Sequence, residues 1–228
     1  MPSNPIADAF RFLLLGGPIM WPLFVCAGVS LYVMIERAVA IGRAATDNEA
    51  LLEGVRRLLG EGRTPEALAL CEGTRGPVAS LVASGIRNRD LDADAIERAM
   101  EELALRETPV LYRRLGVLDT IITIAPLLGL LGTVTGMIKA FNVVGSVGLN
   151  QPLGITGGVA EALIATATGL AIAIVTLIGY NYLTEKVKEI ISEMETRATQ
   201  LMNILVSLRG RDEARPAAPP ARVAEGVA

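Results

Sequence analysis

The chain has 228 residues, a formal net charge of −3 and no histidine, and 51% of its residues are hydrophobic. The absence of histidine and of any cysteine cluster excludes the common zinc sites, and the slightly acidic balance excludes a basic surface for nucleic acid. Charged residues are missing from three long stretches, residues 16–35, 120–138 and 162–183. Each is close to the roughly 20 residues that a helix needs to cross about 30 Å of hydrocarbon. We therefore predict an all-α membrane protein with three transmembrane helices.

Residues 1–15 are predicted to form a periplasmic or interfacial N-terminus, followed by the first transmembrane helix over residues 16–36. A cleaved secretory signal is the alternative for this stretch. Arg11 is the only cation before it and no small-residue cleavage site follows it, so we favour a retained anchor. Cys26 lies in this helix and Cys71 in the polar region beyond it, so we expect no disulfide between them and a packing role for both.

Residues 37–114 are predicted to form a cytoplasmic helical domain. In "EALLEGVRRLLGEG" apolar residues recur at helical spacing until a glycine ends the segment. Thr64 and Pro65 have the N-cap and first-position pattern of a further helix. A longer helix is expected to start near Asp92, and Pro109 should kink or interrupt it.

The second transmembrane helix is predicted over residues 115–141, and one of its faces is built from small residues. The members of this face are Gly129, Gly132, Thr133 and Gly136, and Pro126 continues the line. Membrane helices associate by close packing and hydrogen bonds, because lipid is as apolar as leucine, and small residues favour such contacts. The face is therefore expected to meet a close neighbour.

An uncharged periplasmic link over residues 142–157 leads to the third transmembrane helix over residues 158–183, which has a similar face. The members of that face are Ala162, Thr166, Gly169, Ala173 and Thr176. The two faces can meet each other or line a shared cavity. Alternatively, the threonines bond the carbonyls of their own helices and merely permit tight packing.

Two acidic residues lie near the ends of the predicted spans. Glu161 is within the third span, where a carboxylate costs about 2.5–3.5 kcal/mol at the membrane centre and usually marks an ion or proton path. Because Glu161 follows a pair of glycines by about one turn, it can instead favour the positive end of the helix dipole. Asp119, at the start of the second span, is interpreted as an interfacial partner of Arg113 or Arg114 or as an exposed acid.

The third helix is predicted to continue beyond the membrane as a cytoplasmic helix over residues 184–210. Apolar residues recur there at steps of four and three, as in a coiled coil: Val187, Ile191, Met194, Ala198, Leu201, Leu205 and Leu208. This seam packs either on residues 37–119 of the same chain or on a second copy. Residues 211–228 are rich in proline and alanine and are predicted to be disordered.

Basic residues indicate the orientation of the spans. Arg37 follows the first span, Lys186 and Lys188 follow the third, and the link between the second and third has no charge. Because basic residues remain on the cytoplasmic side, the N-terminus is expected outside and the C-terminus in the cytoplasm. Lys139 runs against this rule, and its long side chain is expected to reach the interface.

The stretches "TIAPLLGLLGTVTGMIKAF", "GGVAEALIATATGLAIAIVTLIGYNYL" and "GPVASLVASGI" resemble the MotA/TolQ/ExbB proton channel family, and most closely its ExbB/TolQ branch. The resemblance covers nearly the whole chain apart from the tail. It implies a pentameric ring in the bacterial inner membrane around a dimer of a single-span partner of the ExbD, TolR or MotB type, which carries a membrane aspartate. The sequence has no phosphate-binding GxxxxGK[ST] run, and we expect neither a cofactor nor an enzymatic activity.

The resemblance also implies a proton path. By position, the family's ring threonines correspond to Thr133 and Thr166 and its glutamate to Glu161, whereas Lys139 departs from the uncharged residue or histidine expected near there. The implied function is that of a proton-conducting stator subunit of an ion-motive-force-driven motor that serves transport, envelope maintenance or gliding. A non-conducting membrane scaffold is the alternative. A solute transporter is less favoured, because three spans lack the internal repeats of transporters.

Overall fold

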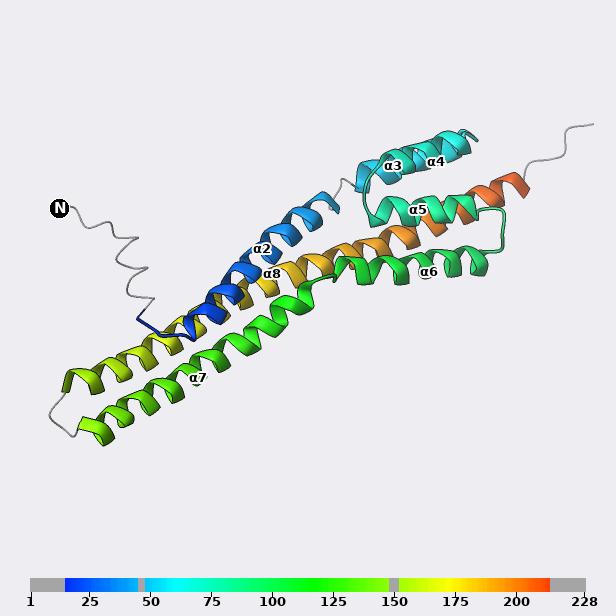
Figure 1. Ribbon diagram of the computed structural model, residues 1–228. Helices are drawn as coiled ribbons and strands as arrows, with labels where there is room; N and C mark the ends of the chain where they lie inside the picture. The colour runs from blue at the N-terminus through cyan, green and yellow to red at the C-terminus, as the bar shows by residue number, and fades with distance from the viewer. Residues whose placement is uncertain (1–14, 45–47, 148–151, 214–228) are drawn as a thin grey trace, which may run out of the picture. The chain divides into compact units, whose positions relative to one another are not determined.

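The computed structural model describes residues 15–44, 48–147 and 152–213, and the regular secondary structure in these ranges is α-helical (Figure 1). This confirms the all-α class. The helices are α2 (Met20–Ala44), α3 (Asn48–Gly60), α4 (Thr64–Gly73), α5 (Pro77–Arg87), α6 (Ala93–Leu111), α7 (Leu115–Val147) and α8 (Pro152–Glu213). They belong to two compact units, Met1–Arg43 with Pro109–Glu189, and Ala44–Thr108 with Ile190–Ala228. The predicted N-terminal segment and the predicted disordered tail lie outside the described residues, apart from residue 15 and residues 211–213.

Three helices contain stretches that are long and apolar enough to cross a membrane, namely α2, α7 and α8. These are the three candidate spans expected from the uncharged stretches of the sequence. α7 has 33 residues, so at 1.5 Å per residue it is about 50 Å long and exceeds the roughly 30 Å of the hydrocarbon core. The helix therefore continues beyond its uncharged part.

α7 and α8 extend farther toward each other than the sequence pattern predicts. α7 ends at Val147 and α8 begins at Pro152, so most of the predicted link, residues 142–157, is helical. Residues 142–147 contain no proline to stop α7. α8 can begin at Pro152 because a proline is well tolerated at the first position of a helix, where its missing N–H is not needed. The early start of α8 changes the depth of Glu161 within that helix.

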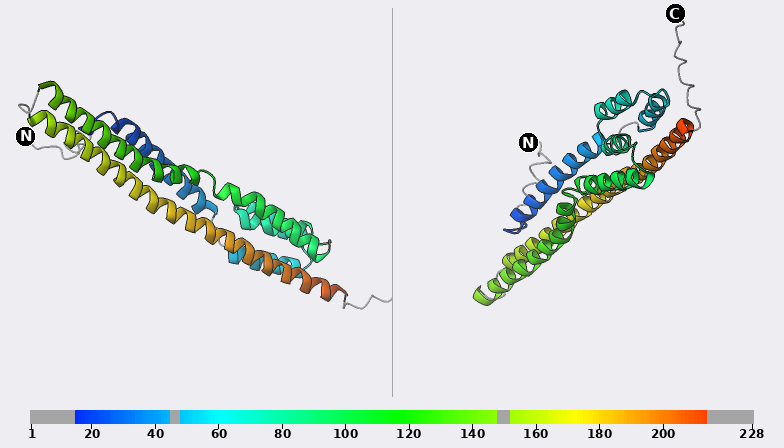
Figure 2. Two further views of the ribbon diagram at one scale, coloured as in Figure 1. Left: turned by 90° about the horizontal axis from the view of Figure 1, so that it is seen from below. Right: turned by 90° about the vertical axis from the view of Figure 1, so that its right-hand side faces the viewer.

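In the first unit α2 packs against α7 and α8, and the latter two run side by side in Figure 1 and in the left view of Figure 2. The buried core of this packing consists of Met20, Leu23, Ile121, Ala125 and Ala173. The opposite faces of the helices are apolar and exposed, as Trp21 (70%), Phe141 (67%) and Ile178 (67%) illustrate. Apolar faces of this extent need hydrocarbon or another protein surface to cover them.

The turn between α6 and α7 is held by a side chain of α2. α6 continues past Pro109, so the predicted interruption falls a few residues later, where Arg114 has a φ of 66°. The buried guanidinium group of Arg37 donates hydrogen bonds to the carbonyl oxygens of Val110 (3.3 Å) and Arg113 (3.2 Å). The carbonyl of Val110 also accepts the amide of Arg113 at 3.3 Å. Arg37 thus adds a second donor at the end of α6 and supplies a donor to the carbonyl of Arg113, in the turn where helical amide partners are missing.

Replacement of Arg37 with methionine should destabilise the first unit, because the carbonyl of Arg113 loses its donor and the carbonyl of Val110 keeps only the amide of Arg113. A buried acceptor without a partner costs about 1–3 kcal/mol, so the Tm of the purified chain in detergent should fall by about 5 °C or more. Arg43→Met is the matched control, because Arg43 lies on the same helix and is exposed. The control should shift the Tm by less than about 2 °C. An unchanged Tm for Arg37→Met would show that these hydrogen bonds do not hold the turn.

α5 is the central helix of the second unit. Gly76 precedes it with a φ of 133°, which L side chains rarely adopt, and Pro77 occupies its first turn. A Cβ added at Gly85 would lie 2.5 Å from Leu201 of α8 and 2.9 Å from Met100 of α6. The buried residues of α5 are Pro77, Val78, Ala79, Leu81, Val82, Ala83, Gly85 and Ile86. The motif "GPVASLVASGI" therefore encodes a helix that packs closely against both α6 and α8.

The apolar seam predicted for the C-terminal part of α8 packs within the chain. Met194, Leu201 and Leu205 are buried in the second unit. Near the end of the seam, the guanidinium group of Arg209 donates to the carbonyl oxygens that follow α5. Of the two alternatives, packing on the same chain is therefore the one that the structure supports.

Both cysteines have free thiols. Cys71 is buried in the second unit, and burial raises the pKa of its thiol to about 11. Cys26 is half-buried beside the core of the first unit. Each thiol thus packs in a different unit, in agreement with the packing roles expected for isolated cysteines.

Candidate functional site

Small residues on both helices make the contact between α7 and α8. Gly129, Gly132 and Gly136 of α7 lie against α8. A Cβ added at Gly136 would lie 2.6 Å from the carbonyl oxygen of Gly158, and one at Gly129 would lie 3.0 Å from the Cα atom of Thr166. These obstacles are backbone atoms, which cannot move aside as the end of a flexible side chain can. The glycines therefore permit a backbone-to-backbone contact that larger residues would prevent.

The α8 side of this contact contains further residues of the predicted small face. Ala162 belongs to the contact, and a Cβ added at Gly169 would lie 2.5 Å from the carbonyl oxygen of Ala125. Ala173 is buried in the core of the first unit, and Pro126 is half-buried next to Ala125 on α7. The two small-residue faces thus meet each other, which is one of the two arrangements that the sequence leaves open.

The threonines of these helices use their hydroxyl groups in two ways. Thr133 and Thr168 each donate to a carbonyl of their own helix, at 2.6 Å and 2.8 Å. Thr166 donates instead across the contact, to the carbonyl oxygen of Gly129 at 2.9 Å. The alternative in which the threonines bond only their own helices therefore describes Thr133 and Thr168 but not Thr166.

Thr166 lies beside Gly129, about one turn from Thr133 along α7. In an α-helix the carbonyl of Gly129 accepts the amide hydrogen of the residue four positions on, which is Thr133. The hydroxyl of Thr166 binds that same carbonyl. Both threonines are half-buried, and a hydroxyl oxygen that has donated its hydrogen still offers lone pairs to another donor. The edge of the contact therefore presents two acceptors that a protonated carboxyl group could bind.

Glu161 is paired with Lys139 across the same two helices. Its Oε1 atom lies 2.5 Å from Nζ of Lys139, and its side chain is 14% exposed, compared with 50% for the lysine. Because α8 begins at Pro152, Glu161 lies more than two turns inside the helix. The helix dipole acts mainly within the first turn. The alternative in which Glu161 favours the positive end of the helix dipole is therefore wrong. The positive charge next to Glu161 is the ammonium group of Lys139.

The segment before α2 covers this ion pair. Gly17 has a φ of 74°, and a Cβ added to it would lie 2.5 Å from Cδ of Glu161. A Cβ at the preceding Gly16 would lie 3.2 Å from Ile164, one turn farther along α8. α7 and the segment before α2 therefore both approach the carboxylate of Glu161 on α8.

Asp119 takes part neither in the small-residue contact between α7 and α8 nor in the ion pair of Lys139 with Glu161. It is exposed near the start of α7. One of its predicted partners, Arg114, pairs instead with Glu36 of α2 at 2.8 Å. Of the two interpretations of Asp119, the structure supports the exposed acid.

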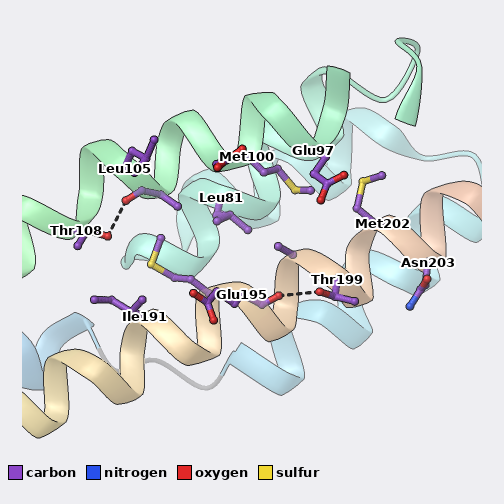
Figure 3. A pocket seen from close by; sticks show the side chains of 14 residues that line it. Leu81, Glu97, Met100, Leu105, Thr108, Ile191, Glu195, Thr199, Met202 and Asn203 are labelled. Carbon is purple, nitrogen blue, oxygen red and sulfur yellow. Dashed lines mark hydrogen bonds between the residues drawn. The ribbon is translucent and has the colours of Figure 1, made fainter. Parts of the chain in front are cut away.

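A groove of about 590 Å³ lies in the second unit between α6 and α8 (Figure 3). Leu81, Met100 and Ile191 give it an apolar lining, and Glu97 and Glu195 add acidic groups. The hydroxyls of Thr108 and Thr199 in the lining each donate to a backbone carbonyl of their own helix. Among the described residues, no group of three or more potential metal ligands is found. The α7–α8 contact is therefore the stronger candidate for the functional site.

The pairing of Lys139 with Glu161 does not follow from helical periodicity, but the sequence contains a signal for it. Lys139 directly follows the uncharged residues 120–138, and Glu161 directly precedes the uncharged residues 162–183. Two consecutive spans of similar length run antiparallel and bring these two charges to one level. No comparable signal indicates the contact of Gly17.

A known protein family matches the part of the chain that contains this site. The model of the MotA/TolQ/ExbB proton channel family matches residues 74–196, which is more than half of the chain. The chain belongs to this family. The matched residues include the whole of α7 and the part of α8 that packs on it. The α7–α8 contact thus lies entirely within the region that defines this proton channel family.

Several relatives of the chain within the family are named as biopolymer transport proteins. The ExbB-like 3 protein of Synechocystis sp. is 32% identical over 169 residues, which are 73% of this chain and 80% of that protein. The ExbB homolog of Methanothermobacter thermautotrophicus is 32% identical over 156 residues, 68% of this chain and 54% of that protein. The ExbB protein of Aquifex aeolicus is 42% identical over 85 residues, 37% of this chain and 57% of that protein. The matches thus cover little more than half the length of the latter two relatives.

Replacement of Gly136 with alanine should weaken the α7–α8 contact, because the added Cβ would meet the backbone of α8. Overpacking typically costs about 1–3 kcal/mol, so the Tm of the purified chain should fall. Gly28→Ala in α2 is the matched control, because nothing lies within 4 Å of a Cβ at that position. Alanine is favoured over glycine in a helix by about 0.8–1.0 kcal/mol, so the control should keep or raise the Tm. Equal Tm values for the two variants would contradict the close approach of the helices.

Proposed function

We propose that the chain is a proton-conducting stator subunit of an ion-motive-force-driven molecular motor in the bacterial inner membrane. The observation that carries the proposal is the hydrogen bond from Thr166 to the carbonyl of Gly129, about one turn from Thr133, between two helices that are apolar enough to span a membrane. Membership in a proton channel family supports the choice of ion. The biopolymer transport names of the relatives favour transport as the work performed, beside envelope maintenance and gliding.

The proton carrier in this proposal comes from another polypeptide. Residues 120–138 and 162–183 contain no carboxylate, and the carboxylate of Glu161 already has a lysine beside it. The apolar part of α7 and α8 therefore offers hydroxyl groups but no acid of its own. A single-span partner of the ExbD or TolR type, with an aspartate in the membrane, supplies the missing group. In this arrangement two partner copies stand at the centre of a ring of five chains, with N-termini outside and C-termini in the cytoplasm.

The hydroxyl groups stabilise the partner's aspartate while it is protonated. A protonated carboxyl group donates to the free lone pairs of Thr133 or Thr166, whose own hydrogens are held by carbonyls. The bond to Gly129 fixes the oxygen of Thr166, so the aspartate finds an acceptor that is already in position. Each proton that moves through a potential of 100 mV releases about 2.3 kcal/mol. Rotation or displacement of the partner within the ring converts this free energy into work.

Thr166→Val should abolish most of the proton flux, because it removes the hydroxyl and keeps a similar shape. A buried donor that is left without an acceptor costs about 1–3 kcal/mol, so the flux through the chain and its partner in liposomes should fall at least about fivefold. Thr133→Val should have an effect in the same direction. Thr166→Ser keeps the hydroxyl group and should retain most of the flux.

Thr168→Val is the matched control for these variants. Thr168 is half-buried on the same helix and bonds the carbonyl of Ile164, but it is two residues from Thr166 and therefore lies about 200° away around α8, off the face that meets Gly129. Its replacement should leave both assembly and flux unchanged. Wild-type flux in a normally assembled Thr166→Val, Thr133→Val double variant would rule out the proposed path.

A non-conducting scaffold is the second candidate function. It is favoured by one observation: the hydroxyl hydrogens of Thr133, Thr166 and Thr168 are all donated within the chain. As a scaffold, the chain would still assemble with its partner, and the wild-type complex in liposomes would carry no proton flux. The same liposome measurement therefore separates the two candidates.

A further inference from the structure

Lys139 and Glu161 lie where the apolar parts of α7 and α8 end. Lys139 is the first charged residue after residues 120–138, and Glu161 is the last before residues 162–183. The ion pair between them, with Nζ and Oε1 2.5 Å apart, therefore closes the apolar part of both helices on the side where the chain passes from α7 to α8. A partly buried pair at such a boundary is screened less by salt than an exposed pair.

The enclosure of the carboxylate is tighter than an ordinary surface pair requires. The side chain of Glu161 is only 14% exposed. Gly17 lies so close to it that an added Cβ would be 2.5 Å from Cδ and 3.0 Å from Cγ. The carboxylate is thus held between a cation of α7, its own helix and the backbone before α2.

A carboxylate with this environment is poorly suited to take up and release a transported ion. The ammonium group of Lys139 already neutralises its charge. A second cation at the same carboxylate would be repelled by the lysine, because like charges at one site disfavour each other. A transported cation at this carboxylate would therefore have to displace the ammonium group of Lys139.

We propose that Lys139 is the fixed counter-ion of Glu161, and that this pair clamps α7, α8 and the Gly16–Gly17 segment together. Glu161 is then a positioning residue and does not carry the transported ion. The part of this inference that concerns the ion rests on the proposed function, whereas the clamp does not. Of the residues assigned to the ion path, Thr133 and Thr166 then remain.

The clamp is tested by the thermal stability of the full-length chain in detergent. Lys139→Met and Glu161→Gln should each lower the Tm by about 5 °C, because each leaves one partner without its counter-charge. The double variant should lose clearly less than the sum of the two single losses, because it leaves no unpaired charge. Strictly additive losses, or no loss in either single variant, would overturn the clamp.

Lys186 and Glu189 provide the matched control pair. Their charged atoms lie 2.6 Å apart, but the two side chains are 43% and 56% exposed. Surface pairs of this kind contribute little, so Lys186→Met and Glu189→Gln should change the Tm only slightly and additively. Each pair gives a double-mutant cycle of two single variants and one double variant. Coupling in the Lys139–Glu161 cycle alone would show that it comes from the enclosed position of this pair.

Proton flux through the full-length chain and its partner in liposomes tests the role of Glu161. Glu161→Gln alone should reduce the flux, because Lys139 is left unpaired, whereas the double variant with Lys139→Met should return to within about threefold of the wild type. Flux that stays absent in a stable double variant would show that Glu161 carries the ion and would overturn the inference. If the wild-type complex carries no flux, the proposed function fails, and the Tm cycle alone still decides whether the clamp exists.

Discussion

The close approach of the α7 and α8 backbones is the contact on which the rest of the first unit depends. Lipid offers two apolar helices no hydrophobic reason to associate, so packing and hydrogen bonds must hold them together. At Gly136 and Gly158 the helices meet without an intervening side chain. The hydroxyl of Thr166 reaches the carbonyl of Gly129 because a glycine leaves that carbonyl uncovered. Lys139 spans the same short gap to reach Glu161.

Charged groups and hydroxyl groups occupy different parts of the first unit. Charged groups fix its two ends: Arg37 binds the carbonyls at the turn between α6 and α7, and Lys139 binds Glu161 near the passage from α7 to α8. Between these ends, residues 120–138 of α7 and 162–183 of α8 contain hydroxyl groups and no charge. This division agrees with the proposed mechanism, in which the only acid in the apolar middle belongs to a partner.

The sequence predicts those features that depend on one helix at a time. The uncharged stretches predict the spans, and the spacing of Gly129, Gly132 and Gly136 predicts which face packs closely. Periodicity places Thr166 on the small face of α8, but it does not determine which residue of α7 lies opposite, so the bond from Thr166 to the carbonyl of Gly129 could not be predicted. The depth of Glu161 depends on where α8 begins, and the helix starts earlier than its glycines suggest. The target of Arg37 lies far along the chain, and no local pattern indicates it.

The most direct test of a hydroxyl-lined ion path is an electron cryo-microscopy structure of the full-length chain with its single-span partner in a lipid bilayer. We expect several copies of the chain to surround the partner, with the partner's membrane carboxyl group within about 3.5 Å of the hydroxyl oxygen of Thr133 or Thr166. A structure in which both threonines contact acyl chains, or in which the partner's acid lies at another level of the α7–α8 pair, would contradict the proposed path.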